Sequence, residues 1–500
     1  MPKVELLGFD AKGAPSPELT PSNVYAADAD ANPFPSRFES VEPGRLTWHR
    51  PDDRGAQLWV FWTVEGFGRV WLPATIGSDE AVVSEALART RRAEVQVVID
   101  DCAALGIDAP PDVTGDLVEA DTLLARAEGR SAPERSMFAD QALAKLLWAG
   151  ERAVLARAKE RIRRTPDKVF RLGANFFGYP KAGDEYAARF VRALNFATLP
   201  FYLGSFEPEC GKPDYGRCAG MAKFLHNKGL RSKGHPLIWF YNGTTPQWQR
   251  DLYAAEGYDG LLRQCTDRVR DCALEYIGLI GSWDIINEAH GWANSLGLTL
   301  EQLVDITRAG CAAGREANPR AELVVNNCCL DGAYVARGHD HEGPAPAERL
   351  CTPLQYMRNV EDAGTDYDVL GLQLYYPSRD LLQIERIMDR FARFGKPIHI
   401  TEVAVPSSMT ADNDSFWKGE DSIRNMGVWR RPWDEDVQAE WVEAFYTLCR
   451  GHPSVEAVTW WDFADYIPGH FFPHGGFLRP DMSPKPAYEV LLRLREEWGA

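Results

Sequence analysis

Long apolar runs are missing from this sequence of 500 residues, and no stretch approaches the length of a membrane-spanning helix. We therefore expect no membrane role. Positive charge is also scarce, since 55 Lys and Arg stand against 72 Asp and Glu, giving a formal net charge of −17. Because phosphate binding depends on clustered Lys and Arg, this balance argues against a nucleic-acid partner, whereas a neutral sugar polymer would not be repelled.

Cysteine is sparse as well, and the patterns of metal and nucleotide sites are missing. The ten cysteines include no CxxC pair and no metal-type spacing. We expect reduced, mostly buried thiols, with a bridge between Cys210 and Cys218 as the alternative in an oxidising compartment. Residues 339–342 hold the only cluster that suggests a metal, and the flanking glycines favour a solvated loop. No Gly-rich phosphate loop and no G-x-S-x-G elbow occurs. The sequence predicts no metal and no cofactor.

Length and composition predict a soluble protein of two folding units. The hydrophobic fraction of 45% and the charged fraction of 25% are ordinary for globular proteins. Five hundred residues exceed the usual size of a single core, so we expect a large catalytic domain and an N-terminal accessory region. Residues 1–13 contain no apolar core of secretory-signal length. We expect a cytoplasmic protein as given, or a secreted one if a leader was removed.

The N-terminal third divides into a β-rich module and a helical connector. Residues 1–40 are rich in Pro, Ala, Ser and Asp, which predicts irregular structure, and aromatic and β-branched runs over 45–76 predict strands. The module therefore covers 1–77. Its Trp59, Trp62 and Trp71 are interpreted as core, with a sugar-stacking platform as the alternative.

Three helices are predicted for the connector, residues 78–165. The first covers 78–105, with Ser78 as its cap, an acidic first turn and Gly106 as its stop. The others cover 117–127 and 133–163, where Ala, Leu, Arg and Glu recur at helical spacing. Pro133 suits a first helical position.

From residue 166 to 500, short apolar runs alternate with longer helical segments, as in a parallel sheet wrapped by helices. Eight such runs occur, at 170–177, 196–203, 233–240, 282–289, 321–327, 368–376, 397–405 and 457–465. Eight is the number that closes a barrel. The sequence predicts an α/β fold whose catalytic domain is a (β/α)8 TIM barrel.

Polar and aromatic side chains gather at the C-terminal ends of these runs, which open onto the catalytic face of such a barrel. Glu288 ends the fourth run and Glu402 ends the seventh. Glycosidic bond cleavage needs one carboxyl that donates a proton and one ionised carboxylate at the anomeric carbon. Retention of configuration further needs the two groups about 5 to 5.5 Å apart. We therefore predict Glu288 as acid/base and Glu402 as nucleophile.

The motifs around these carboxylates resemble glycoside hydrolase family 10, whose best-known members are endo-β-1,4-xylanases. WDIINEA at 283–289 is similar to the family's acid/base motif, and HITE at 399–402 to its nucleophile motif. Further agreement lies in GHPLIW at 234–239, TPQW at 245–248, GLQ at 371–373, TWWDFAD at 459–465 and SPKPAYEVL at 483–491.

The resemblance implies a set of substrate-binding side chains around the sugar at subsite −1. Asn287 is implied to contact the sugar 2-hydroxyl, Trp461 to form a stacking floor, and Asp465 to support the end of the eighth strand. Trp460 is interpreted as barrel core. The substrate-binding set that follows is His235, Trp239, Asn287, Gln373, Tyr375 and Trp461.

Departures from the family pattern concentrate where substrate is chosen. The polar grip that holds the −2 xylose is replaced by the apolar and aromatic residues 199–203. Phe240 and Tyr375 stand where the family has His, and the loop at 466–470 lacks the usual Trp. Because a site built for hydrogen bonds rejects ligands that cannot make them, these changes should alter substrate choice while leaving the chemistry in place.

We therefore predict a retaining hydrolase of β-glycosidic bonds in xylan or a related plant β-glycan, with carbohydrate as its partner. An exo-acting β-glycosidase or transglycosylase on small or aryl-decorated glycosides is the alternative within enzymes. A non-catalytic carbohydrate-binding protein is the alternative from another class, although binding alone does not need both carboxylates.

Overall fold

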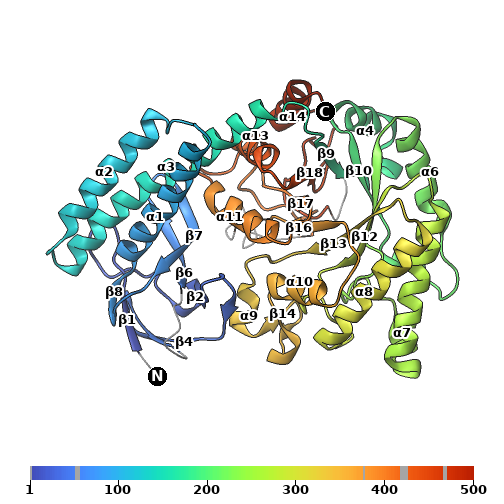
Figure 1. The fold of residues 1–500 in the computed structure, drawn as a ribbon, viewed down its shortest axis with the longest axis horizontal. Helices are drawn as coiled ribbons and strands as arrows, with labels where there is room; N and C mark the ends of the chain where they lie inside the picture. Colours follow the sequence, from blue (N-terminus) through green and yellow to red (C-terminus); the bar gives the residue numbers. More distant parts are fainter. Residues whose placement is uncertain (1–2, 51–56, 376–377, 417–425, 466–469) are drawn as a thin grey trace.

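The computed structural model describes residues 3–50, 57–375, 378–416, 426–465 and 470–500. It contains a closed eight-stranded barrel, preceded by two four-stranded sheets and three helices (Figure 1). The barrel lies on one side of Figure 1, and the N-terminal sheets and helices α1 to α3 lie beside it. The (β/α)8 barrel and the preceding sheets and helices that the sequence predicts are thus confirmed.

The N-terminal sheets run β4-β5-β1-β8 and β3-β2-β6-β7. Their strands are β1 Lys3–Leu7, β2 Val24–Ala27, β3 Pro33–Phe34, β4 Arg37–Glu42, β5 Arg45–His49, β6 Gln57–Val64, β7 Gly68–Thr75 and β8 Glu80–Val82. The prediction of irregular structure over residues 1–40 is therefore wrong. The Pro-rich and Asp-rich composition of this segment gives no local signal for its short strands. They are stabilised by pairing with strands distant in sequence, as β1 is by β5 and β8.

The three N-terminal helices are α1 Val83–Ala104, α2 Pro111–Ala127 and α3 Ala132–Arg164. The predicted cap at Ser78 is wrong, because Glu80–Val82 pairs in parallel with β1 and delays the helix to Val83. Pairing with a neighbouring strand outweighs the local cap signal here. Gly106 stops α1 as predicted, with φ 67°. Ser131 caps α3 in a capping box with Glu134.

The predicted core role of the N-terminal tryptophans holds for Trp59 and Trp62, which are buried. Trp59 stacks on Tyr25 at 5.9 Å between ring centroids, and Trp62 donates from Nε1 to Asp140 Oδ1 at 3.0 Å. Trp71 is half-buried and stacks on Phe61 at 5.0 Å. These rings are therefore occupied by contacts within the protein.

The barrel strands follow one another in chain order and close through β9 and β18. They are β9 Arg171–Asn175, β10 Phe196–Pro200, β11 Arg231–His235, β12 Ser282–Asn287, β13 Glu322–Asn327, β16 Val369–Gln373, β17 Ile398–Val403 and β18 Val455–Trp460. Each lies within one of the eight predicted runs or overlaps it. All the β9, β12, β16 and β17 residues are buried, as expected for strands covered by helices on the outside and packed side chains within.

Helices of the region from residue 166 to 500 cover the barrel on the outside (Figure 1). They are α4 Tyr179–Ala193, α5 Leu203–Phe206, α6 Tyr215–Asn227, α7 Gln247–Glu275, α8 Leu300–Ala317, α9 Ala333–Arg337, α10 Pro353–Asp362, α11 Leu381–Ala392, α13 Glu435–Gly451 and α14 Pro486–Trp498. A small hairpin, β14 His339–Asp340 and β15 Gly343–Pro344, lies between α9 and α10. Helix α3 packs against α11 and α13, which joins the N-terminal region to the barrel.

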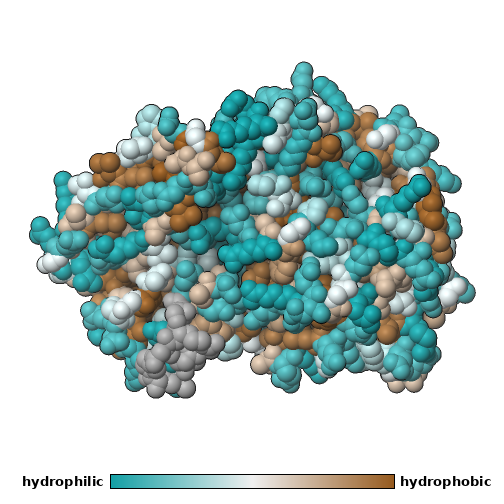
Figure 2. All heavy atoms as spheres, viewed as in Figure 1, coloured by the Kyte–Doolittle hydropathy of each residue, from teal (hydrophilic) through white to brown (hydrophobic). Residues whose placement is uncertain are grey.

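Hydrophilic side chains cover most of the face seen in Figure 2, with apolar residues scattered among them. Within the described ranges, none of the helices combines the length and the apolar character that a bilayer crossing requires. All ten cysteines are free thiols, so the alternative bridge between Cys210 and Cys218 does not form in this structure.

Candidate active site

Two glutamates lie at the C-terminal ends of barrel strands, as predicted. Glu288 directly follows β12, and Glu402 is the fifth residue of β17. Only 8% of Glu288 and 6% of Glu402 is exposed. Glu288 adopts a left-handed backbone conformation with φ 57°, which is uncommon for a residue other than glycine. Its N–H donates to Asn326 O at 2.9 Å, and this bond holds the turn that directs the side chain.

Three amide side chains connect the two carboxyl groups. Gln373 Nε2 donates to Glu288 Oε1 at 3.0 Å and to Asn287 Oδ1 at 3.2 Å. Asn326 Nδ2 donates to the same Asn287 oxygen at 2.8 Å and to Glu402 Oε1 at 3.3 Å. A continuous hydrogen-bonded chain therefore runs from one carboxyl to the other across β12, β13, β16 and β17.

Each carboxyl also receives a hydrogen bond from an aromatic side chain. Trp239 Nε1 donates to Glu288 Oε2 at 3.2 Å, and Tyr375 OH donates to Glu402 Oε2 at 3.0 Å. His235 Nε2 lies 3.7 Å from Glu402 Oε1. Both glutamates are thus held in fixed orientations before any substrate arrives, which is what preorganised catalysis requires.

A buried ionic array lies beneath Glu402. Asp284 Oδ2 is 2.7 Å from both Lys233 Nζ and His235 Nδ1, and none of the three side chains is more than 2% exposed. Although burial opposes ionisation, Lys233 and His235 hold the pKa of Asp284 below its ordinary value. Burial lowers the pKa of His235 despite the neighbouring carboxylate. Asp284 thereby orients a neutral imidazole toward Glu402.

The environment raises the pKa of both glutamates. Burial raises the pKa of Glu288 to about 6, against hydrogen bonds from Gln373 and Trp239 that lower it. Burial, together with the charge of Glu288, also raises the pKa of Glu402, whereas the hydrogen bond from Tyr375 and the charge of Lys233 favour its ionised form. Because each carboxylate opposes the ionisation of the other, the pair favours a state with one protonated and one ionised group. One protonated and one ionised carboxyl is the state that glycoside cleavage uses.

Five of the six predicted substrate-binding residues contact a carboxyl of this pair directly or through one amide: His235, Trp239, Asn287, Gln373 and Tyr375. Trp461 lies one ring further away, edge-on against His235 at 5.2 Å between ring centroids. Trp460 is fully buried and donates from Nε1 to Gly475 O at 2.7 Å, in agreement with its interpretation as core.

The site also includes residues that sequence reasoning did not select. Lys233 and Asp284 lie inside barrel strands, where charged side chains are usually avoided. A charged residue at such a position is the sequence signal that could have indicated a buried ion pair. Asn326 is a polar residue near the end of β13, and that position alone assigns it no role. Thr401 Oγ1 donates to Asn326 Oδ1 at 2.5 Å and fixes the orientation of that amide.

Tyr202 occupies the position where the family pattern has a polar grip. Its ring lies 5.6 Å from the His235 ring and 6.0 Å from the Trp239 ring, measured between centroids. Burial, with the nearby charges of Glu402 and Glu288 among the further causes, raises the pKa of its hydroxyl well above the ordinary value. An aromatic side chain therefore borders the catalytic pair on the side of β10.

A row of aromatic rings extends from Trp239 to the β14–β15 hairpin. Trp239 stacks on Tyr241 at 4.8 Å, and His341 lies 4.7 Å from Tyr241 and 5.6 Å from Trp292. Among the described residues, no group of three or more His, Cys, Asp or Glu side chains has a metal-binding arrangement. The predicted loop at 339–342 instead contributes His341 to this row.

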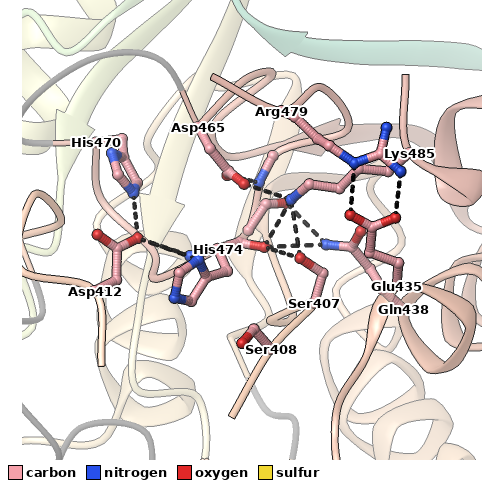
Figure 3. Close-up of polar contacts among 12 residues, drawn as sticks. Ser407, Ser408, Asp412, Glu435, Gln438, Asp465, His470, His474, Arg479 and Lys485 are labelled. Atoms are coloured by element: carbon pink, nitrogen blue, oxygen red, sulfur yellow. Dashed lines mark hydrogen bonds and ion pairs between the residues drawn. The ribbon is translucent and has the colours of Figure 1, made fainter. Parts of the chain in front are cut away.

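The loops after β17 and β18 are joined by a polar network (Figure 3). Lys485 Nζ donates to Asp465 Oδ2 at 2.5 Å and to Ser407 Oγ at 2.9 Å. Asp412 Oδ2 contacts His470 Nε2 at 2.8 Å. Asp465 thus supports the region after β18, the role that the resemblance implies. Residues 466–469 of the departing loop lie outside the described residues.

Comparison with known proteins adds three findings. The model of the family described as Glycosyl hydrolase family 10 matches residues 202–493. The chain is 22% identical to endo-1,4-beta-xylanase B of Thermotoga neapolitana over 346 residues, which cover 66% of this chain and 88% of that protein. It is 26% identical to an endo-1,4-beta-xylanase of Geobacillus stearothermophilus over 251 residues, 47% of this chain and 66% of that protein.

A solved structure shares the fold at low sequence identity. It is a family 10 endoxylanase retrieved from a sugarcane soil metagenome, with a TM-score of 0.50 and 20% identity. The match covers 67% of this chain and 99% of that one. The two structures therefore share their fold over about two thirds of this chain.

Proposed function

Because the chain belongs to glycosyl hydrolase family 10, we propose that it hydrolyses β-glycosidic bonds in xylan or a related plant β-glycan with retention of configuration. The observation that carries this proposal is the buried pair Glu288 and Glu402, connected through Asn287, Asn326 and Gln373. The names of the relatives in Thermotoga neapolitana and Geobacillus stearothermophilus support xylan as the first substrate to test.

In the first step, Glu402 attacks the anomeric carbon while Glu288 gives its proton to the leaving oxygen. The bond from carbon to the leaving oxygen breaks, and an ester between the sugar and Glu402 forms. Tyr375, Asn326 and His235 surround the attacking carboxylate and keep its oxygens in place. Asn287 is available for the sugar 2-hydroxyl, whose hydrogen bond strengthens as charge develops on the ring.

In the second step, Glu288 acts as a base. Having lost its proton, it takes one from water, and the resulting hydroxide equivalent attacks the anomeric carbon and releases Glu402. Protonation of Glu288 returns the pair to its starting state. The raised pKa of Glu288, about 6, suits a group that must both give and take a proton near neutral pH.

A second candidate is an exo-acting β-glycosidase or transglycosylase on small or aryl-decorated glycosides. The position of Tyr202 favours it, because an aromatic ring stands beside His235 and Trp239 where a polar grip for a further sugar is expected. A glycan extending past this ring would lose hydrogen bonds there. Short or aryl-bearing substrates would lose less.

Product analysis separates the two candidates. Xylohexaose with an endo-acting enzyme gives internal fragments of two to four sugars at early times, whereas an exo-acting enzyme releases one product from the chain end. NMR of the first-formed anomer reports retention. No turnover of xylo-oligosaccharides or of aryl β-glycosides by folded protein would refute both candidates and favour a carbohydrate-binding protein.

A further inference from the structure

The segment that follows β16 is held by the N-terminal region. Trp71 N, in β7, donates to Ser378 O at 3.3 Å. Both carboxylate oxygens of Asp380 accept from Arg91, in α1. Leu381 N donates to Glu151 Oε1, in α3, at 3.0 Å. Arg379 lies over the Trp59 ring, in β6, at 5.1 Å to the centroid. All four residues 378–381 therefore contact elements that lie outside the barrel.

The contact between Arg91 and Asp380 is the strongest of these attachments. Arg91 Nη1 and Nη2 lie 2.7 and 3.0 Å from the two oxygens of Asp380. The side chains are 2% and 0% exposed. A bidentate guanidinium–carboxylate pair fixes both position and orientation, and burial makes the loss of either partner costly.

The other end of the same segment lies in the catalytic site. Gln373, the last residue of β16, donates to Glu288, and Tyr375 donates to Glu402. Tyr375 and Ser378 are three residues apart, so the chain between them spans at most about 11 Å. Residues 378–380 are therefore tied to Tyr375 by a short stretch of chain.

We propose that Arg91 is a positioning residue, which holds Tyr375 against Glu402 by binding Asp380. This inference rests on the proposed function. The N-terminal region is then part of the catalytic apparatus of this chain. The alternative is that the ion pair contributes to stability alone.

The two readings differ in the pH dependence they imply. A hydrogen bond from Tyr375 to ionised Glu402 favours the charged carboxylate. When Tyr375 is displaced, the pKa of Glu402 rises. Because kcat/KM needs ionised Glu402, its acid limb then moves to higher pH. A pair that contributes only stability leaves the limb where it is.

Arg91→Lys in the full chain tests the proposal, with an aryl β-xylobioside and an aryl β-xyloside as probes and kcat/KM measured from pH 4 to 9. Arg157→Lys is the matched control. Arg157, in α3, binds Glu385 of α11 at 2.6 Å with 5% and 4% exposure, so it joins the same two regions away from residues 378–381.

We expect both variants to unfold at lower temperature. Only Arg91→Lys is expected to lower kcat/KM, by about tenfold at pH 6, and to move the acid limb upward. In a chain that already carries Tyr375→Phe, Arg91→Lys should not move the acid limb of the kcat/KM profile further. Both changes remove the same hydrogen bond, from Tyr375 to Glu402.

Equal pH profiles for Arg91→Lys and Arg157→Lys would overturn the proposal, as would an additive effect with Tyr375→Phe. If Arg91→Lys does not fold, the double variant Arg91→Gln/Asp380→Asn removes both charges together and carries the same expectations. An inactive wild-type chain would refute the proposed function and this inference with it. An active one with unchanged variants would refute the inference alone.

Discussion

Glu288 combines a left-handed backbone conformation with a buried carboxyl, and both features are unusual for glutamate. Holding such a backbone costs on the order of 1–3 kcal/mol, and the bond from Glu288 N to Asn326 O helps to maintain it. The result is a side chain that receives hydrogen bonds from Trp239 and Gln373. We interpret this geometry as the means by which a proton donor is aimed at the leaving oxygen.

Glu288→Ala is expected to slow substrates that need protonation of the leaving group about 10²- to 10⁴-fold, because general acid assistance is worth that much. Substrates with activated aryl leaving groups should lose far less in the first step. The rates on xylobiose and on a dinitrophenyl β-glycoside measure the difference. Equal losses on both would contradict the acid/base role, and Glu342→Ala on the exposed hairpin loop serves as the control.

The sequence was most informative about residues at strand ends. Glu288, Glu402 and the side chains around them lie where the resemblance implies, because an α/β barrel brings all its strand ends to one face. Lys233 and Asp284 escaped prediction, since their pairing depends on two strands that meet only in the folded barrel. The role of Tyr202 depends on ring packing that spacing alone does not report.

At the scale of elements, the helices and barrel strands followed their periodicity, whereas the short N-terminal strands did not. Each barrel strand lies within, or overlaps, one of the eight apolar runs of the sequence. Strands β1, β2 and β8 lie outside the runs that predicted strands, and they are specified by their partners. The strand at Glu80–Val82 displaced a predicted helix start for this reason.

The contact of β6 with α3 gives a prediction for the pH dependence of stability. Burial raises the pKa of Asp140 from 3.8 to about 7, although the hydrogen bond from Trp62 lowers it. The folded state therefore keeps its proton where the unfolded chain has lost it. As the pH rises from about 4 to 7, the free energy of unfolding therefore falls. Above pH 7 the ionised carboxylate of Asp140 stays in a partly buried position.

Asp140→Asn should thus raise the free energy of unfolding at pH 8 by roughly 1–3 kcal/mol, because asparagine still accepts from Trp62 without a charge. Near pH 4 the variant and the wild type should be equally stable. Urea unfolding at both pH values measures the difference. Destabilisation at pH 8 would show that the carboxylate is ionised and favourably bound in the folded protein.

At the scale of the whole molecule, the N-terminal region and the barrel share an ionic interface. Arg91 binds Asp380 and Arg157 binds Glu385 across it, and both pairs are almost completely buried. These partners are 289 and 228 residues apart in the chain. No periodicity links such positions, so the sequence predicted separate units at 1–77, 78–165 and 166–500 and could not predict how they join.

Thermal unfolding of the full chain is expected to show one cooperative transition, because unfolding either part exposes unpaired buried charges in the other. Calorimetry tests this by comparing the calorimetric enthalpy with the van't Hoff enthalpy. Arg157→Met should lower the free energy of unfolding by roughly 3–5 kcal/mol, and so lower the midpoint temperature of the single transition. Two resolved transitions in the wild type would contradict the shared interface.

Trapping the glycosyl-enzyme tests whether Glu402 forms a covalent bond with the sugar. A 2-deoxy-2-fluoro β-xylobioside with an activated leaving group slows the second step more than the first, so the glycosyl-enzyme accumulates and can be located by peptide mass spectrometry. We expect one sugar adduct per chain, on the peptide that contains Glu402. An adduct on Glu288, or full turnover with inverted product and no adduct, would contradict it.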